Sequence, residues 1–251
     1  MLLPSMNENL RVIVVGASGG IGAALTQMLA SATQSAQIYA LTRSGHSADN
    51  PQLNNDKITH MRCDFSDADS LSNAAQRLKD SGKFDLIIIA TGLLHGEGIT
   101  PEKNLRAMSH DGFAQSFMSN TIGPAMCAQA FLPLLRRDQK SVFTALSARV
   151  GSISDNRLGG WYAYRAAKAA LNMVIKTLSI EYRRRFPETI IAGLHPGTVD
   201  TPLSKPFQRQ VPDGKLFTPE FCATNLLKVI DGLKPEDSGG LFAWDGEKIP
   251  F

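Results

Sequence analysis

Short runs of apolar, largely β-branched residues recur along this chain, and each run stops at a glycine or a polar residue. Such runs are typical of strands that are buried on both faces of a sheet. Segments with helical periodicity lie between most of them. The alternation predicts one α/β domain over residues 1–251, a doubly wound parallel sheet with helices on both faces. The expected strands are Leu10–Val15, Gln37–Leu41, Lys57–Cys63, Phe84–Ala90, Ser141–Leu146, Thr189–Leu194 and Gly240–Trp244.

The longest helical pattern is interrupted. It runs from Ser109 to Arg136, and Asn120–Gly123 stands inside it. Because Asn and Gly are unfavourable within a helix, we expect a kink or a polar role there. The other expected helices are Ala23–Ala30, a helix capped by Asp67 that runs through Arg77, a helix that holds Tyr164 and ends near the basic run Arg183–Arg185, and Pro219–Leu233.

Polar segments rich in Gly, Pro, Asn and Ser predict the loops. These are His46–Asp56, Leu93–Thr100, Ala148–Gly160 and a substrate lid at residues 203–218. His95 lies in a loop that follows a strand, where doubly wound sheets bind ligands. A histidine at this place either lines a substrate entrance or lies on the surface.

The turn after the first strand is rich in glycine, Gly16-Ala-Ser-Gly-Gly-Ile-Gly22. A strand, a glycine-rich turn and a helix in succession form the site where the pyrophosphate of a dinucleotide binds, on backbone N–H groups at the start of the helix. Arg43 follows the second strand, where such folds meet the adenosine ribose. Because an Arg suits a 2′-phosphate and no acid stands beside it, the sequence favours NADP(H) over NAD(H).

Tyr164 and Lys168 stand four residues apart in a helical pattern without Gly or Pro, so both side chains lie on one face. A phenol alone is a poor acid at neutral pH, and a nearby ammonium lowers its pKa. The pair therefore predicts an acid/base unit that moves a proton to or from an alcohol oxygen.

Composition narrows the remaining choices. The net charge is only +3, which argues against nucleic acid or an anionic membrane as partner. Three scattered cysteines, Cys63, Cys127 and Cys222, predict reduced, buried thiols rather than disulfides or a metal site. The chain shows neither a signal peptide nor an apolar run that could span a bilayer, so a cytoplasmic protein is expected.

Together these motifs resemble the short-chain dehydrogenase/reductase family, and the resemblance covers essentially the whole chain. It implies a Rossmann-like fold and an NAD(P)-dependent enzyme of the carbonyl reductase type, which moves a hydride between NADP(H) and a small carbonyl or alcohol substrate. A C-factor-like branch of the family is similar in the Gly159–Arg165 and Trp244–Gly246 stretches. The implied cofactor-binding residues are Gly16, Ser18, Gly20, Ile21, Gly22, Arg43, Asp64, Phe65, Ala90, Thr91, Gly92, Pro196, Gly197, Thr198 and Thr201.

The resemblance also assigns catalytic roles. Tyr164 would donate a proton to the carbonyl oxygen, and Lys168 would lower the pKa of Tyr164 and bond the nicotinamide ribose. Ser147 would polarise the carbonyl, and Asn120 would hold a water that links Lys168 to solvent. Family members commonly pair through the helices that carry Asn120 and Tyr164, which implies a homodimer or homotetramer.

The chain departs from the family pattern in three places. Ile89-Ala90-Thr91-Gly92 stands after the fourth strand, where the family often has Asn-Asn-Ala-Gly. The catalytic Ser usually precedes a glycine by three positions, and counting back from Gly151 gives Ala148; Ser147 takes the role, Ser152 replaces it, or the hydroxyl is absent. The spacing of Gly16, Gly19 and Gly22 also fits a larger, sugar-nucleotide-modifying branch, whose C-terminal region this chain lacks.

Two other functions therefore stay open. One is a sensor or signalling protein that binds NADP(H) and barely turns over. The other is an epimerase or dehydratase that acts on a nucleotide sugar and retains NAD.

Overall fold

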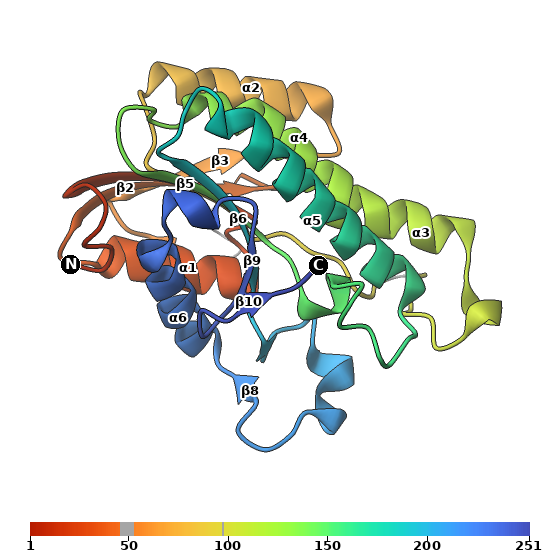
Figure 1. Ribbon diagram of the computed structural model, residues 1–251. Coiled ribbons are helices and arrows are strands. Elements are labelled where there is room, and N and C mark those ends of the chain that lie inside the picture. The colour runs from red at the N-terminus through yellow and green to blue at the C-terminus, as the bar shows by residue number, and fades with distance from the viewer. Residues whose placement is uncertain (46–52, 97) are drawn as a thin grey trace.

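The computed structural model describes residues 1–45, 53–96 and 98–251, so part of the expected His46–Asp56 loop and one residue of the Leu93–Thr100 loop lie outside it. An eight-stranded sheet in the order β10-β9-β6-β5-β4-β1-β2-β3 forms its centre (Figure 1). The strands are parallel except for the antiparallel edge pair β9–β10. They are β1 (Asn9–Val15), β2 (Ser35–Thr42), β3 (Ile58–Arg62), β4 (Leu86–Ile89), β5 (Ser141–Leu146), β6 (Thr189–His195), β9 (Leu241–Ala243) and β10 (Lys248–Ile249).

Helices cover both faces of this sheet. Figure 1 shows α1 (Gly20–Ser31) and α6 (Pro219–Gly232) on one side and α2 (Ala68–Asp80), α4 (Gly123–Phe131) and α5 (Tyr162–Arg183) on the other. A shorter helix, α3 (His110–Phe117), precedes α4. The doubly wound α/β architecture expected from the sequence is thus confirmed.

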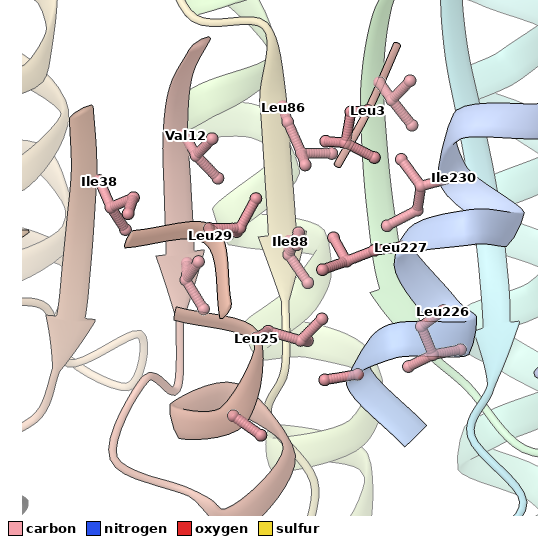
Figure 2. Close-up of a cluster of buried hydrophobic side chains, with 14 of the residues drawn as sticks. Leu3, Val12, Leu25, Leu29, Ile38, Leu86, Ile88, Leu226, Leu227 and Ile230 are labelled. Carbon is pink, nitrogen blue, oxygen red and sulfur yellow. The ribbon is translucent and has the colours of Figure 1, made fainter. Parts of the chain in front are cut away.

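Alternate residues of each strand belong to two separate hydrophobic cores, because successive side chains of a strand point to opposite faces. Val12 and Val14 of β1 pack toward α1 and α6, while Ile13 and Val15 pack toward α2, α4 and α5. Figure 2 shows the first core, where Leu25 and Leu29 of α1 and Leu226, Leu227 and Ile230 of α6 meet the strand side chains. Burial on both faces explains why the strands read as continuous apolar runs.

The interruption expected near Asn120 is real. Met118–Ile122 form a π-helical turn between α3 and α4, which widens the helix by one residue at that point. Gly123 follows it, and a Cβ there would lie 2.4 Å from the Phe65 ring, so only glycine fits. The break therefore has two causes: a wide turn that holds Asn120 and close packing against Phe65.

Other elements differ in detail from the sequence expectations. Asp67 caps α2 as expected, by accepting from the N–H groups of Asp69 and Ser70, but the helix continues to Asp80. The antiparallel strand β10 was not predicted, because Lys248–Ile249 is too short to show a pattern. The three cysteines are free and buried, as expected. Within the described residues, no helix combines the length and apolarity that a bilayer crossing requires.

Candidate active site

The glycine-rich turn joins β1 to α1 at the carboxyl edge of the sheet. Gly16 has a φ of 83°, a conformation that favours glycine, and a Cβ on Gly22 would lie 2.2 Å from the Gly16 carbonyl oxygen. A Cβ on Gly20 would lie 2.6 Å from the side chain of Thr201. No side chain caps α1, so backbone N–H groups at its start face outward and suit an anion.

A cavity of about 280 Å³, here called the glycine cleft, opens beside this turn. The buried Oγ1 of Thr91 has no hydrogen-bond partner among the described residues. The Thr91 hydroxyl is thus free to bond a ligand, and the glycine turn lets a ligand approach the backbone closely. Both features fit a dinucleotide. Of the residues expected to bind the cofactor, the cleft is lined by Gly16, Ser18, Arg43, Phe65, Ala90, Thr91 and Gly92.

Asp64 lies next to this cleft but is absent from its lining. Its carboxylate accepts from the Ser66 hydroxyl at 2.6 Å and the Ser66 N–H at 3.0 Å. These bonds, followed by the charges of Arg43 and Arg62, lower the pKa of Asp64. The acid and Arg43 are therefore close enough to interact, at the end of β2 and β3 where an adenosine would lie.

Helix α5 carries the candidate proton-transfer pair. Lys168 is buried, and its Nζ donates to the Leu146 carbonyl at 2.7 Å and lies 5.8 Å from the centre of the Tyr164 ring. Burial lowers the pKa of Lys168 to about 7 and raises the pKa of Tyr164 to about 12. The expected acidification of Tyr164 by Lys168 is thus wrong for this structure, because burial disfavours the charged form of both groups.

Asn120 is completely buried in the π-helical turn. Its Nδ2 donates to the Leu93 carbonyl at 2.7 Å, and its Oδ1 accepts from the Leu93 N–H at 3.0 Å. A Cβ on Gly92 would lie 3.6 Å from the Asn120 Oδ1 and 3.9 Å from the Lys168 Nζ. Asn120 therefore fixes the loop after β4 and lies near Lys168.

A second cavity of about 220 Å³, here called the tyrosine cavity, is bounded by Tyr164. Its walls come from the ends of β5 and β6, from α5 and from the expected lid. Among the predicted residues it is lined by Ile21, Ser147, Tyr164, Pro196, Gly197, Thr198 and Thr201. The residues expected on the nicotinamide side and the tyrosine expected to be catalytic thus share one cavity.

The structure distinguishes the three alternatives for the catalytic serine. Ser147 lines the tyrosine cavity, but its Oγ donates to the Asn172 Oδ1 at 2.7 Å. Ser152 is absent from the lining, and its Oγ accepts from the Asp155 N–H. Ala148 lines the cavity with a methyl group only. The hydroxyl proton of Ser147 is therefore already engaged within the chain.

Sequence reasoning missed Trp161 and His195, which both line the tyrosine cavity. Trp161 has a φ of 51°, and its ring packs edge-on to Tyr164 and to Phe207, at centroid distances of 6.3 and 5.1 Å. The backbone carbonyl of Glu102 accepts from the Trp161 N–H at 2.6 Å. The aromatic residue before the Tyr164 helix was a visible signal for Trp161. The position of His195 at a strand end, directly before Pro196 and Gly197, was a signal for the second.

The expected lid folds over this cavity. It contains a 3₁₀ helix, Lys205–Gln210, and the short strand β8 (Leu216–Phe217), which pairs with β7 (Thr198–Val199). The His95 ring packs against Phe207 of the lid, and its Nε2 lies 3.0 Å from the carbonyl of Pro202, just before the lid. Leu203, Phe207 and Val211 contribute apolar surface to the cavity.

The family model for short chain dehydrogenases matches residues 11–212. This chain belongs to the short-chain dehydrogenase/reductase family. An uncharacterized oxidoreductase of Schizosaccharomyces pombe is 28% identical, covering 95% of this chain and 96% of that protein. The C-signal protein of Myxococcus xanthus is 38% identical over 55% of this chain and 78% of its own length. A Rhodococcus 1-hydroxy-2-glutathionyl-2-methyl-3-butene dehydrogenase is 34% identical over 73% of this chain and 76% of its own.

Solved structures of this family share the fold. An NADPH-bound carbonyl reductase from chicken fatty liver superimposes with a TM-score of 0.85 at 23% identity, covering 98% of this chain and 96% of that one. The carbonyl reductase Sniffer of D. melanogaster gives 0.83 at 21% identity, covering 97% and 99%. The short-chain dehydrogenase/reductase fold, an oxidoreductase fold, thus spans nearly the whole chain.

Proposed function

We propose that this protein is an NADP(H)-dependent carbonyl reductase in which Tyr164 gives a proton to the carbonyl oxygen. The observation that carries the proposal is the position of Tyr164 on a cavity that also holds Pro196, Gly197 and Thr198, beside a glycine cleft suited to a dinucleotide. The cofactor supplies the hydride when bound. Residues 203–218 act as the lid, which excludes water from the carbonyl.

The protonation of the pair supports the reducing direction. A phenol whose pKa is raised to about 12 by burial keeps its proton at neutral pH and can donate it. An amine whose pKa is lowered to about 7 by burial can both lose and regain a proton near neutral pH. Lys168 would therefore restore the Tyr164 proton and would bond the ribose of the cofactor, and a water held near Asn120 would connect Lys168 to solvent.

The lining of the tyrosine cavity supports an uncharged, apolar carbonyl substrate. Its side chains include Leu94, Val150, Trp161, Phe207 and Val211, and no Asp, Glu, Lys or Arg among the described residues lines it. A charged substrate would lose its hydration here without gaining a partner. Aromatic and alkyl aldehydes, ketones and quinones are the compounds to screen.

The deciding experiment is the Tyr164→Phe variant. It is expected to bind NADPH within about twofold of the unmodified protein and to lose at least about 10²-fold in kcat, since proton transfer by a positioned side chain contributes roughly that much. Tyr162→Phe is the matched control, because Tyr162 is exposed on the same helix. Turnover retained in Tyr164→Phe refutes the assignment.

Arg43 supports NADP(H) rather than NAD(H). It is exposed at the end of β2 and lines the glycine cleft. Arg43→Ala is expected to weaken NADPH binding at least tenfold and to leave NADH binding nearly unchanged, because only NADPH carries the 2′-phosphate. Arg77→Ala, at an exposed position of α2, is the control, and calorimetric titration with both cofactors is the measurement. Equal losses for both cofactors contradict the preference.

A row of exposed apolar side chains supports a homodimer or homotetramer. Met118, Ile122, Met126, Met173 and Ile180 are exposed on the π-helical turn, α4 and α5. Met173→Glu is expected to shift the protein toward monomer in light scattering, while the exposed Lys228→Glu control is not. The free, buried cysteines support a reducing compartment, hence a cytoplasmic protein, which cell fractionation tests.

One observation favours a second function. Because the Ser147 hydroxyl is engaged with Asn172 and Ala148 offers no donor, a protein that senses NADP(H) with little turnover also fits, and the likeness to C-signal supports it. Tight NADPH binding without oxidation by any aldehyde, ketone or quinone would favour the sensor.

A further inference from the structure

A half-buried imidazole lies at the carboxyl end of β6. His195 is the last residue of that strand, next to the end of β5, where the Ser147 N–H donates to the Leu194 carbonyl at 2.8 Å. His195 lines the tyrosine cavity together with Tyr164 and Ala148. The imidazole is therefore on the wall that would surround a bound carbonyl group.

The Nδ1 of His195 is buried and has no hydrogen-bond partner among the described residues. Buried polar atoms normally have one, so an orphaned nitrogen in a ligand cavity points to a ligand atom as its partner. The charged groups that act on the ring are Arg149, after β5, and Asp245, after β9. Arg149 is itself engaged, with Glu247 at 2.6 Å and Asp155 at 3.7 Å.

Several hydroxyls of the same cavity are already engaged within the chain. The Ser147 Oγ donates to Asn172, and the hydroxyls of Thr201 and Ser204 donate to the Val199 carbonyl at 3.3 and 2.5 Å. Ala148, at the position where the family's serine would stand, offers a methyl group. A carbonyl oxygen bound beside Tyr164 therefore finds three donors that no other described residue engages: the Thr198 hydroxyl, the Trp161 Nε1–H and the His195 ring. Of these, only the His195 Nδ1 is buried without a partner, so it gains most from a ligand oxygen.

We propose that the Nδ1–H of His195 donates a hydrogen bond to the substrate carbonyl oxygen, opposite Tyr164, and so polarises the carbonyl in place of a serine at position 148. The inference rests on the proposed reductase function. Chemically, the bond is made by a neutral ring: it stabilises the oxygen as hydride reaches the carbon, and the proton that is transferred still comes from Tyr164.

The protonation state agrees with this role. Burial, followed by the charge of Arg149, lowers the pKa of His195 to about 4. The ring then carries one N–H at neutral pH, and the role requires that this hydrogen is on Nδ1. Nitrogen-15 NMR of the histidine rings of the full-length protein should show His195 neutral at pH 5.5 and protonated at Nδ1.

Four variants test the contact. Asn places its amide nitrogen near the Nδ1 position of His, and Gln places it near Nε2. His195→Leu is expected to lower kcat about 10²-fold, the usual loss for one donor to a developing oxyanion, with NADPH affinity within twofold. His195→Asn should recover at least tenfold of that loss and His195→Gln should not. Ala148→Ser should raise kcat in the His195→Leu protein while changing the unmodified protein little.

The outcomes separate this inference from the proposed function. Acetophenone is the probe: it should shift the Nδ1 resonance of His195 in the NADP⁺ complex. Turnover with His195→Leu within threefold of normal, or an Nε2–H tautomer that acetophenone leaves unchanged, overturns the His195 contact and leaves the reductase standing. A shifted Nδ1 resonance in a protein that turns over no carbonyl refutes the reductase and retains His195 as a ligand contact.

Discussion

Replacing Lys168 by methionine should make the protein more stable while removing its activity. Methionine resembles lysine in length and volume but has no charge to bury. Lys168 is 2% exposed, and among the described residues its Nζ has one hydrogen-bond partner, the Leu146 carbonyl at 2.7 Å. A buried amine with one hydrogen bond lowers the free energy of unfolding. We expect that the protein retains Lys168 because proton transfer requires it.

The magnitude follows from linkage. Burial lowers the pKa of Lys168 from 10.5 to about 7, a span of about 3.5 units. At about 1.4 kcal/mol per unit, protonation of this lysine stabilises the unfolded state at pH 7 by about 4 kcal/mol relative to the folded state. Loss of the Leu146 bond costs the variant about 1 kcal/mol, so Lys168→Met should gain about 3 kcal/mol at pH 7.

The sign of the pH dependence is fixed by the lowered pKa. Between pH 7 and about 10.5 the unfolded chain binds the proton and the folded chain does not, so the stability of the unmodified protein rises with pH. Lys168→Met lacks this titration, and its advantage should close to near zero by pH 10. Every other titrating group is common to both proteins and cancels in the difference.

Urea unfolding at pH 7, 8, 9 and 10, without cofactor, measures this difference. Lys176→Met is the matched control, because Lys176 is exposed on the same helix, and its effect should stay within about 0.5 kcal/mol at every pH. A stability gain that does not change between pH 7 and 10, or a variant that is less stable at pH 7, would refute the reasoning. Ketone reduction by Lys168→Met should fall at least about tenfold.

Three further changes test the framework of the site. Gly22→Ala should abolish NADPH binding and lower the urea midpoint, because its Cβ would lie 2.2 Å from the Gly16 carbonyl; unchanged binding would contradict the tight turn. Glu102→Ala should lower the free energy of unfolding in urea by about 1–2 kcal/mol, since the Glu102 Oε2 accepts from the Ala163 N–H at the start of α5. Glu102→Gln keeps an acceptor and should lower it less. Phe207→Ala should raise KM for apolar ketones at least tenfold with kcat little changed, and an unaltered KM in steady-state assays would exclude Phe207 from the substrate wall.

The sequence was sufficient for the fold and for the elements that hold the glycine cleft. Continuous apolar runs identified the buried strands, because parallel strands covered on both faces need no polar alternation. The glycine pattern identified the turn, because Gly16 and Gly22 meet at a distance that no side chain permits. Asn120–Gly123 was recognised as an interruption because both residue types are poor helix formers.

The environment of each side chain could not be predicted from the sequence. Burial raises the pKa of Tyr164, which the four-residue spacing from Lys168 did not indicate. The Lys168 amine bonds the carbonyl of Leu146, a residue 22 positions away. Likewise, the hydroxyl of Ser147 is engaged by Asn172, which is distant in sequence. His195 and Trp161 have their roles only because strand ends, α5 and the lid converge on one cavity.

The π-helical turn at Met118–Ile122 amounts to a one-residue insertion into an otherwise continuous helix. Its extra residue changes the phase between α3 and α4, so the side of the helix that Asn120 presents to Leu93 is set by this single step. Shortening the segment by one residue would rotate Asn120 by about 100° around the helix axis and turn its amide away from the β4 loop. Gly123 and Pro124 would still interrupt the helix at this place. The wide turn thus anchors that loop where the sequence already breaks the helix.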